Sequence, residues 1–318
     1  MKKTKLMIAL LAGLTLGACS NDNDELTPQP KQEPSFPLTI EVTENPMMQD
    51  GEEGNDATRS DITTGTSASF TSFNIDYVYG ANSTGHKVSM RTGDNWEAGS
   101  WPTTAVETNA EVKWYAYTGG TFNLNEGTPY INFEVDENVA AQHDLLVATT
   151  SGTYSGTLGN LSFAFDHPCA AVRFWIKKST NINDKTFTVS NIKLKNVIKD
   201  GKYYYGTKTW NKGTTSTEFT LYSGSGYTLP ALPSNTYLPM DGGTPCYLFL
   251  IPQELTAWNP AYALGNTYLE VTCSVDGGGS QTAYIPFQAA FAAGKKYDVK
   301  INIGKNSLYS GPNTLIIP

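Results

Sequence analysis

The stretch that decides the fold is FPLTIEV, residues 36–42, which has an apolar side chain at nearly every second position. Alternation with period two is typical of a β-strand that turns one face toward a core. An acidic run with Gly and Pro follows over residues 44–56, and such a run predicts a solvated loop. Beyond it, Arg59 precedes Ser60 and is the only basic residue nearby. We therefore predict a strand that proteolysis can remove, with four apolar positions: Phe36, Leu38, Ile40 and Val42.

The first 19 residues have the features of a lipoprotein signal peptide. Lysines precede an apolar run over residues 6–16, which is too short to span a bilayer. The run ends in the lipobox Leu16-Gly17-Ala18-Cys19, and a polar, acidic run over residues 20–25 follows at once. We therefore expect cleavage before Cys19 and acylation of this residue, which would anchor the chain in the outer membrane. An ordinary signal peptide that happens to contain a cysteine is the alternative.

Charge is distributed unevenly along the chain. The formal net charge is −8; residues 1–19 contribute +3 and residues 20–58 contribute −9, so −2 remains for residues 59–318. No basic patch is available to displace counterions from phosphates, which argues against a nucleic-acid partner. Residues 20–59 combine acidic residues with several prolines, a composition that predicts a semi-extended tether carrying one strand.

Short alternating apolar runs recur from residue 70 to residue 303, separated by turn residues. Residues 172–177, VRFWIK, show the pattern clearly. This spacing predicts an all-β protein made of sandwiches. Because one sandwich holds about seven to nine strands, we expect two, at residues 60–166 and 167–318. Residues 288–293 are the one notable helical candidate, and residues 223–243 predict a long loop.

The sequence shows no pattern of catalytic residues, so we expect a protein that is not an enzyme and needs no metal or cofactor. The three histidines, His86, His143 and His167, lack a neighbouring nucleophile motif. His143 with Asp144 is a weak candidate for a dyad or metal site. A hydrogen-bonded histidine at a turn or domain junction is the more ordinary interpretation.

Cysteines and aromatic residues leave two alternatives open. Beyond Cys19 there are three cysteines without metal-ligand spacing. Cys246 and Cys273 lie in strand-like runs, where they either pair or stay buried as small thiols. The aromatic residues either fill strands or form a sugar-stacking surface. The candidates for such a surface are Trp96, Trp101, Trp114, Trp175, Trp210, Trp258 and residues 203–205.

Several motifs, taken in order, resemble the fimbrillin-like family of Bacteroidales lipoproteins. They run from the lipobox to near the C-terminus and include DLLVA at 144–148, LSFAFDH at 161–167, AVRF at 171–174, IPQ at 251–253 and GKKY at 294–297. Trp96 and Trp101-Pro102, before VKWYAY at 112–117, also fit. Each motif is short, but their shared order makes the resemblance specific.

The resemblance implies a cell-surface pilus subunit with two transthyretin-like β-sandwich domains in tandem. It further implies export as a lipoprotein and removal of the N-terminal segment, with its first strand, by an Arg-specific protease. A strand from the next subunit then fills the exposed groove. Arg59 and Ser60 match the processing site, and residues 36–42 match the strand that leaves. The alternative is that residues 36–42 are a permanent first strand and Arg59 is an ordinary surface residue. The implied partners are other pilus subunits, in a homo- or hetero-polymer.

The C-terminal tail bears on the role of the subunit. Its candidate donor residues are Leu308, Leu315 and Ile317, which make a poorer donor than residues 36–42 because Pro312 divides them. Stalk subunits of the family tend to carry a longer donor tail. The resemblance therefore slightly favours a tip or accessory subunit over a stalk subunit. The competing interpretation is a surface lipoprotein that binds glycans through exposed aromatics and never polymerises.

Overall fold

The computed structural model describes the chain between residues 35 and 314, with gaps. The described residues are 35–44, 48–49, 72–79, 83–92, 95–102, 110–125, 127–153, 161–178, 184–229, 236–238, 240–241, 244–245, 247–261, 265–303, 309–310 and 313–314. For residues 35–49, 83–102, 236–245 and 309–314, this description covers the backbone alone. Residues 35–318 form one compact unit.

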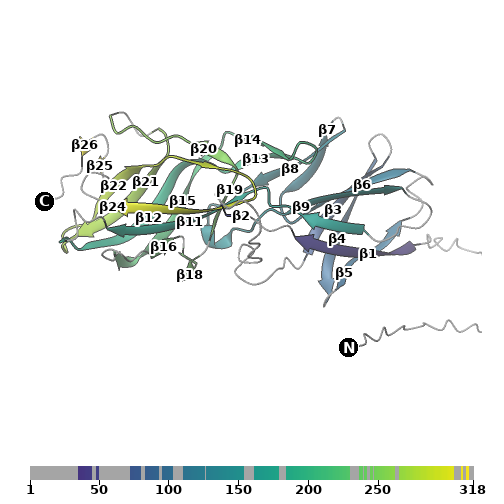
Figure 1. Ribbon diagram of the computed structural model, residues 1–318, viewed down its shortest axis with the longest axis horizontal. Coiled ribbons are helices and arrows are strands. Elements are labelled where there is room, and N and C mark those ends of the chain that lie inside the picture. The colour runs from purple at the N-terminus through teal and green to yellow at the C-terminus, as the bar shows by residue number, and fades with distance from the viewer. Residues whose placement is uncertain are drawn as a thin grey trace, which may run out of the picture. The chain divides into compact units, whose positions relative to one another are not determined.

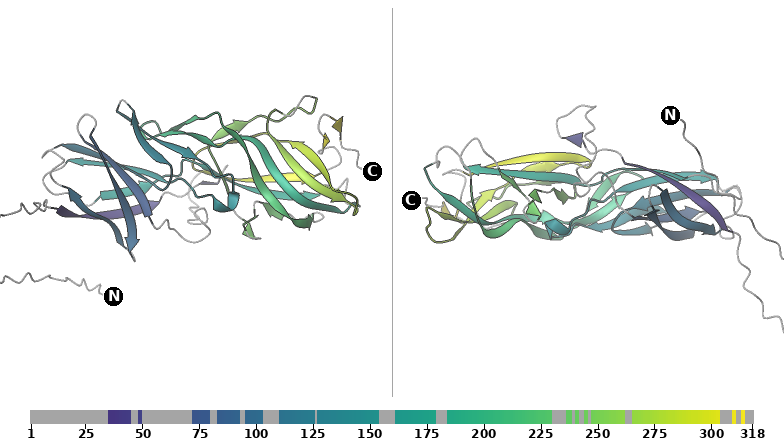
Figure 2. Two further views of the ribbon diagram at one scale, coloured as in Figure 1. Left: turned by 180° about the vertical axis from the view of Figure 1, so that it is seen from behind. Right: turned by 90° about the horizontal axis from the view of Figure 1, so that it is seen from below.

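The first sheet has seven strands and contains the N-terminal strand predicted from the sequence. β1 (Ser35–Glu44) lies inside this sheet, drawn in purple among blue strands in Figure 1 and in both views of Figure 2. The order across the sheet is β10 (Leu161–Phe165), β1, β5 (Asn95–Pro102), β4 (Ser83–Thr92), β3 (Ser72–Tyr79), β6 (Glu111–Tyr117) and β9 (Val147–Thr153).

Alternation in the sequence explains why these segments form strands with one buried face. In β3, Phe73, Ile75 and Tyr77 are buried while the positions between them are not. β10 repeats the pattern over five residues, with buried and exposed positions in strict alternation. The buried faces meet in a cluster that also contains Trp114, the largest fully buried side chain of this part. Burial of each large apolar side chain contributes roughly 1.5–3 kcal/mol to stability.

The remaining strands form two larger sheets, a four-stranded sheet and two short ribbons. One larger sheet contains β15 (Ser216–Thr228), β12 (Phe187–Ile198), β21 (Tyr268–Val275), β22 (Gln281–Pro286), β25 (Tyr309–Ser310) and β26 (Asn313–Thr314). The other contains β16 (Thr236–Leu238), β11 (Ala170–Lys178), β24 (Lys295–Ile303), β2 (Met48–Gln49) and β19 (Leu248–Leu250). The ribbons pair β17 (Met240–Asp241) with β18 (Thr244–Pro245) and β20 (Gln253–Leu255) with β23 (Ala289–Phe291).

The four-stranded sheet joins segments from both predicted domains. Its order is β14 (Thr209–Lys212), β13 (Asp200–Tyr204), β8 (Thr128–Glu134) and β7 (Thr121–Asn125). β7 and β8 precede the predicted boundary at residues 166–167, whereas β13 and β14 follow it. The all-β sandwich class is confirmed, and the division into domains at 60–166 and 167–318 stays a prediction.

Two local predictions are wrong. The helical candidate at residues 288–293 contains β23, because pairing with β20 overrides the helix propensity of its alanines. The predicted long loop at residues 223–243 contains the end of β15 and the strands β16 and β17. The only helix among the described residues is a 3₁₀ turn, η1 (Val139–Ala141).

Candidate functional site

The candidate site is the place that β1 occupies in the seven-stranded sheet. β1 pairs in parallel with β10, with Ile40 in register with Leu161 and Val42 with Phe163. On its other side it pairs antiparallel with β5, from Ser35 opposite Pro102 to Ile40 opposite Trp96. Both edges of β1 are therefore engaged, so the predicted strand over residues 36–42 is an interior strand of the sheet.

β10 supplies the described wall beside β1. Leu161, Phe163 and Phe165 are buried, with 6%, 0% and 0% of their surfaces exposed. The ring of Phe73 on β3 meets Phe163 and Phe165 edge to face, at centroid distances of 5.8 and 5.1 Å. Such aromatic pairs add about 0.5–1.5 kcal/mol beyond the area they bury. The register of β1 therefore follows a row of apolar side chains that belong to the core.

β10 and β9, the two end strands of the sheet, are joined by a β-bridge of two backbone hydrogen bonds. The Val147 amide donates to the Asp166 carbonyl at 3.0 Å, and the Asp166 amide donates to the Val147 carbonyl at 2.8 Å. In the described part of the chain, this bridge at the start of β9 is the only backbone pairing on that side of β10. β10 thus has one full ladder, which β1 provides.

The N-terminal segment has a second contact, on a different sheet. β2 pairs in parallel with β24, placing Met48 opposite Lys295 and Gln49 opposite Lys296. The predicted tether therefore contains two paired strands where the sequence predicted one, because β2 lies within the predicted loop over residues 44–56. Cys19, Arg59 and Ser60 lie outside the described residues, as do the side chains of residues 36–42.

The C-terminal tail returns to the edge of the six-stranded sheet. Tyr309 of β25 pairs with Tyr284 of β22, and β25 in turn pairs with β26. The predicted donor residues Leu308, Leu315 and Ile317 lie outside the described residues. Their role stays a prediction.

The junction after β10 contains a buried histidine and carboxylate. The His167 Nδ1 atom contacts Asp144 Oδ2, and the two side chains are 3% and 0% exposed. His143 is exposed, so the weakly predicted dyad of His143 with Asp144 is wrong, and the hydrogen-bonded histidine at the junction is confirmed. Trp210 reaches the same junction by donating from Nε1 to the Pro168 carbonyl at 2.8 Å.

The predicted exposed aromatic surface is not formed by the described tryptophans. Trp114 and Trp258 are 1% and 2% exposed, which makes their part in such a surface wrong. Trp210 is half-buried, as is Trp175, whose ring lies 5.6 Å from the Arg173 guanidinium. The side chains of Trp96 and Trp101 lie outside the described residues. Tyr203 and Tyr205 are buried, and Tyr204 is half-buried.

Two further predictions concern thiols and metals. Cys273 is a free, buried thiol, and burial raises its pKa to about 11. Cys246 lies outside the described residues. Among the described residues, no group of three or more His, Cys, Asp or Glu side chains is arranged to hold a metal ion. Within the same residues, we find no helix with the length and apolarity to span a membrane.

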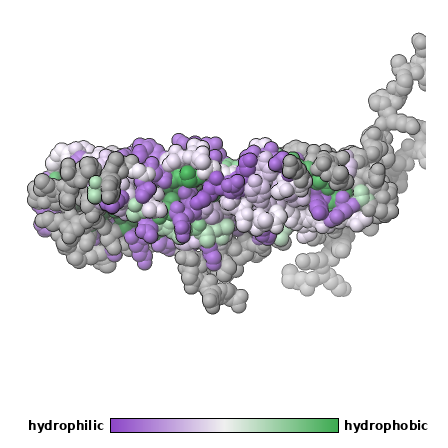
Figure 3. Space-filling view, turned by 90° about the horizontal axis from the view of Figure 1, so that it is seen from above, coloured by the Kyte–Doolittle hydropathy of each residue, from purple (hydrophilic) through white to green (hydrophobic). Residues whose placement is uncertain are grey.

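The described residues expose little apolar area. On the face in Figure 3, apolar residues form small patches among hydrophilic ones. Among the described residues, Tyr227 is the one large apolar side chain that is exposed, at 37%. Among the described residues, the buried row of β10 is therefore an apolar surface that lies beside β1 and is covered while β1 is in place.

Comparison with known proteins adds a family and a fold. The family model described as fimbrillin-like matches residues 50–316, so the match begins after β1. A fimbrial protein from Bacteroides vulgatus shares the fold, with a TM-score of 0.51 at 16% identity over 85% of this chain and 95% of that chain.

Two putative cell adhesion proteins, from Bacteroides ovatus and Bacteroides uniformis, have TM-scores of 0.46 and 0.46 at 16% and 16% identity. They cover 87% and 88% of this chain, and 95% and 96% of their own chains. No curated protein sequence matches the chain.

Proposed function

The chain belongs to the fimbrillin-like family, and from that premise we propose that it is a structural subunit of a cell-surface pilus. It is exported as an outer-membrane lipoprotein acylated at Cys19. An Arg-specific protease then cuts between Arg59 and Ser60, and β1 leaves with the released segment. A strand from another subunit takes its place, so the partners are other pilus subunits in a homo- or hetero-polymer.

The observation that supports this proposal is the interior position of β1. A strand at the N-terminal end of a chain can leave a sheet without rearranging the rest of the fold, provided that the chain after it is cut. Here the released segment also carries β2, so the short pairing of β2 with β24 is lost at the same time. Because β1 pairs with β5 and β10 at once, its departure leaves two strand edges facing one slot. Unpaired edges beside an apolar row favour the addition of a foreign strand.

The free energy available for the exchange is large. β1 forms ten registered pairs, five with β10 and five with β5. If each corresponds to about one hydrogen bond with a net value of roughly 0.5–1.5 kcal/mol, the ladders contribute roughly 5–15 kcal/mol. Each of its four apolar side chains adds roughly 1.5–3 kcal/mol where it is fully buried. Together these upper values reach roughly 11–27 kcal/mol, which equals or exceeds the stability of a whole domain, about 5–15 kcal/mol, so an empty slot would not persist.

The subunit accepts a strand from another subunit at either position in the pilus, the tip or the stalk. The described tail strands β25 and β26 have two residues each, far shorter than the ten residues of β1. A short tail suits a tip or accessory subunit, which accepts a strand and need not donate one. We retain the stalk as the alternative position.

N-terminal sequencing of the protein extracted from the cell surface tests the proposal. We expect the assembled form to begin at Ser60 and Arg59→Ala to remain a monomeric precursor with acylated Cys19. Lys31→Ala, which changes a basic residue upstream of β1, is the matched control and should assemble normally. Fibres built from Arg59→Ala subunits at the wild-type level would overturn the proposal.

A further inference from the structure

The outer face of the four-stranded sheet has a hollow of about 560 Å³. This volume falls within the range of about 300–1,000 Å³ that is usual for ligand sites. Lining residues come from all four strands or the turns beside them, and three glycines lie among them: Gly120, Gly201 and Gly213. The strands β7, β8, β13 and β14 do not pair with β1, so the hollow is independent of the slot described above.

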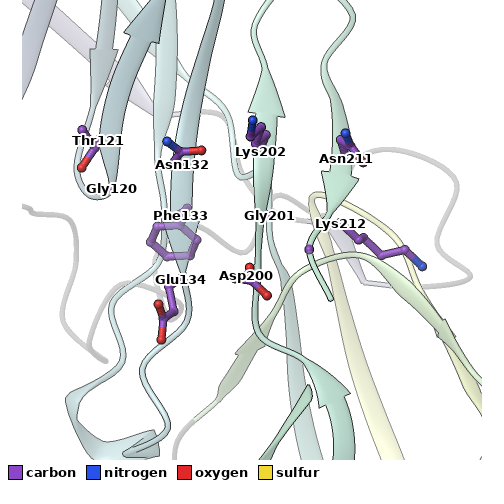
Figure 4. A pocket seen from close by; sticks show the side chains of 11 residues that line it. Gly120, Thr121, Asn132, Phe133, Glu134, Asp200, Gly201, Lys202, Asn211 and Lys212 are labelled. Carbon is purple, nitrogen blue, oxygen red and sulfur yellow. The ribbon is translucent and has the colours of Figure 1, made fainter. Parts of the chain in front are cut away.

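Strand register brings a row of polar residues across the hollow. Lys202 of β13 stands opposite Asn132 of β8 on one side and Asn211 of β14 on the other. Thr121 of β7 stands opposite Asn132 and extends the row to the fourth strand. Figure 4 shows Asn132, Lys202 and Asn211 side by side on their three strands. All four residues are exposed.

The amides in this row have spare hydrogen-bonding capacity. Within the described part of the chain, the Asn132 and Asn211 side chains make no hydrogen bond to protein. Each amide can donate and accept at once, which matches a hydroxyl group that also does both. The two acids of the hollow are already engaged: Glu134 contacts Lys199 at 2.7 Å, and Asp200 accepts from the Thr215 amide at 3.1 Å.

The charge of the hollow favours a neutral ligand. Lys202 and Lys212 balance Glu134 and Asp200, so the lining carries no formal net charge. An anion would be attracted by the two lysines and repelled by the two carboxylates. A cation has no arranged group of ligands here, since no group of three or more His, Cys, Asp or Glu among the described residues could hold one. An apolar ligand would strip water from the whole polar row without compensation.

Aromatic rings adjoin the polar row on the same face of the sheet. Tyr130 and Tyr204 stand opposite each other, two residues along β8 and β13 from Asn132 and Lys202, with ring centroids 5.5 Å apart. Both are half-buried, so each ring keeps some accessible surface. The Lys202 ammonium lies 5.0 Å from the Tyr130 centroid. A flat ring beside hydroxyl-matching amides suits a molecule with both apolar C–H faces and hydroxyl edges.

We propose that this hollow, the Asn132 groove, binds a neutral oligosaccharide. Asn132, Asn211 and Thr121 hydrogen-bond to its hydroxyl groups, Lys202 donates to its oxygen atoms, and Tyr130 packs against a sugar face. The groove thus gives the subunit an adhesive function of its own. This function does not require strand exchange, because none of these residues belongs to the slot.

An array of immobilised neutral oligosaccharides of glucose, galactose, mannose and N-acetylglucosamine, probed with the soluble chain from residue 20 onward, tests the proposal. We expect at least one neutral oligosaccharide to bind, and the Asn132→Ala/Asn211→Ala double variant to lose about tenfold or more in affinity by calorimetry. Asn125→Ala is the matched control, since this exposed residue of β7 lies outside the lining. It should bind as the parent does.

Three outcomes would overturn the proposal. The first is that no neutral oligosaccharide on the array binds the chain, and the second is that only anionic glycans bind. The third is that the double variant binds with the same affinity as the parent. Urea unfolding of both variants shows that each is folded when it is assayed. Because the precursor carries the groove as well, loss of glycan binding and loss of polymerisation are separate results.

Discussion

A substitution in β1 tests the strand-exchange proposal at its physical basis. Val42 is in register with Phe163, which is fully buried, whereas its neighbour Thr43 is in register with Ala164, which is exposed. Successive strand positions alternate between the two faces of a sheet. We therefore expect Val42→Asn to weaken the hold of β1 on the slot, and Thr43→Asn, which places the same side chain one residue further on, to leave it nearly unchanged.

The magnitude follows from burial at the Phe163 position. Where the Val42 side chain shares the burial of Phe163, its loss costs roughly 1.5–3 kcal/mol, and an amide buried there without a partner costs about 1–3 kcal/mol more. The total of roughly 2.5–6 kcal/mol should appear as a lower free energy of unfolding for Val42→Asn. For Thr43→Asn we expect a change within about 0.5 kcal/mol, which is usual for surface substitutions. Urea denaturation followed by tryptophan fluorescence measures both values.

The same substitution should bypass the protease. In the uncleavable Arg59→Ala background, a loss of 2.5–6 kcal/mol would raise the open fraction of the slot by roughly 10²–10⁴-fold. We expect Arg59→Ala/Val42→Asn precursor to join polymers of wild-type mature subunits, as measured by size-exclusion chromatography and electron microscopy. Arg59→Ala/Thr43→Asn should stay monomeric. Two results would refute the reasoning. One is an equal loss of stability in Val42→Asn and Thr43→Asn, and the other is an Arg59→Ala/Val42→Asn precursor that stays monomeric.

Three other predictions concern the remaining contacts. Phe163→Ala should lower the free energy of unfolding by about 3–5 kcal/mol in urea denaturation, because the side chain is fully buried between Phe73 and Phe165. Hydrogen bonds from Lys193 and then Lys195 lower the pKa of Glu218. The stability that these two ion pairs contribute is therefore present above the usual glutamate pKa and is lost as pH falls through the lower pKa of the folded state. Glu218→Gln should flatten a plot of melting temperature against pH in that acid range, and an unchanged slope would contradict this. In a Cys246→Ser mature chain, Cys169 and Cys273 should react with a thiol reagent at pH 8 only after unfolding, since burial raises the pKa of both thiols; rapid reaction of the native chain would contradict this.

The strands with strict alternation could be predicted from the sequence. β10 and β11 follow their apolar pattern closely, and β1 lies where FPLTIEV predicts it. β5 could not be predicted in the same way, because its sequence, NWEAGSWP, has no period of two and contains Gly and Pro. It forms a strand because β1 and β4 pair with it on both sides. Partners far away in the sequence supply what the local pattern lacks.

The candidate sites were predicted unevenly for the same reason. A removable strand has a local signature, but the neighbours of β1 do not, because β10 lies about 120 residues further along the chain and pairs in parallel. The Asn132 groove has no signature in any single segment, since its row takes one residue from each of four strands. The one local hint is Gly201 inside a strand. A side chain there would press on the Asn211 carbonyl and the Trp210 ring, at 3.0 and 3.2 Å.

In the proposed mechanism, the length of chain between β1 and β3 explains how a cut would act as the switch without any change in the slot itself. The 27 residues from 45 to 71 keep β1 beside its slot at an effective concentration on the order of millimolar. A donor strand at micromolar concentration then competes at a disadvantage of roughly a thousandfold, or about 4 kcal/mol, even if it fits the slot equally well. The proposed cleavage after Arg59 would remove this advantage and leave every contact of β1 in place. We therefore expect the cut segment to remain bound until a donor displaces it, so that the segment co-purifies with freshly cleaved monomer and appears in the supernatant as fibres form. If the segment instead dissociated at once from a monomer that stayed folded and soluble, β1 would contribute far less than its two ladders imply, and the exchange would need a different source of free energy.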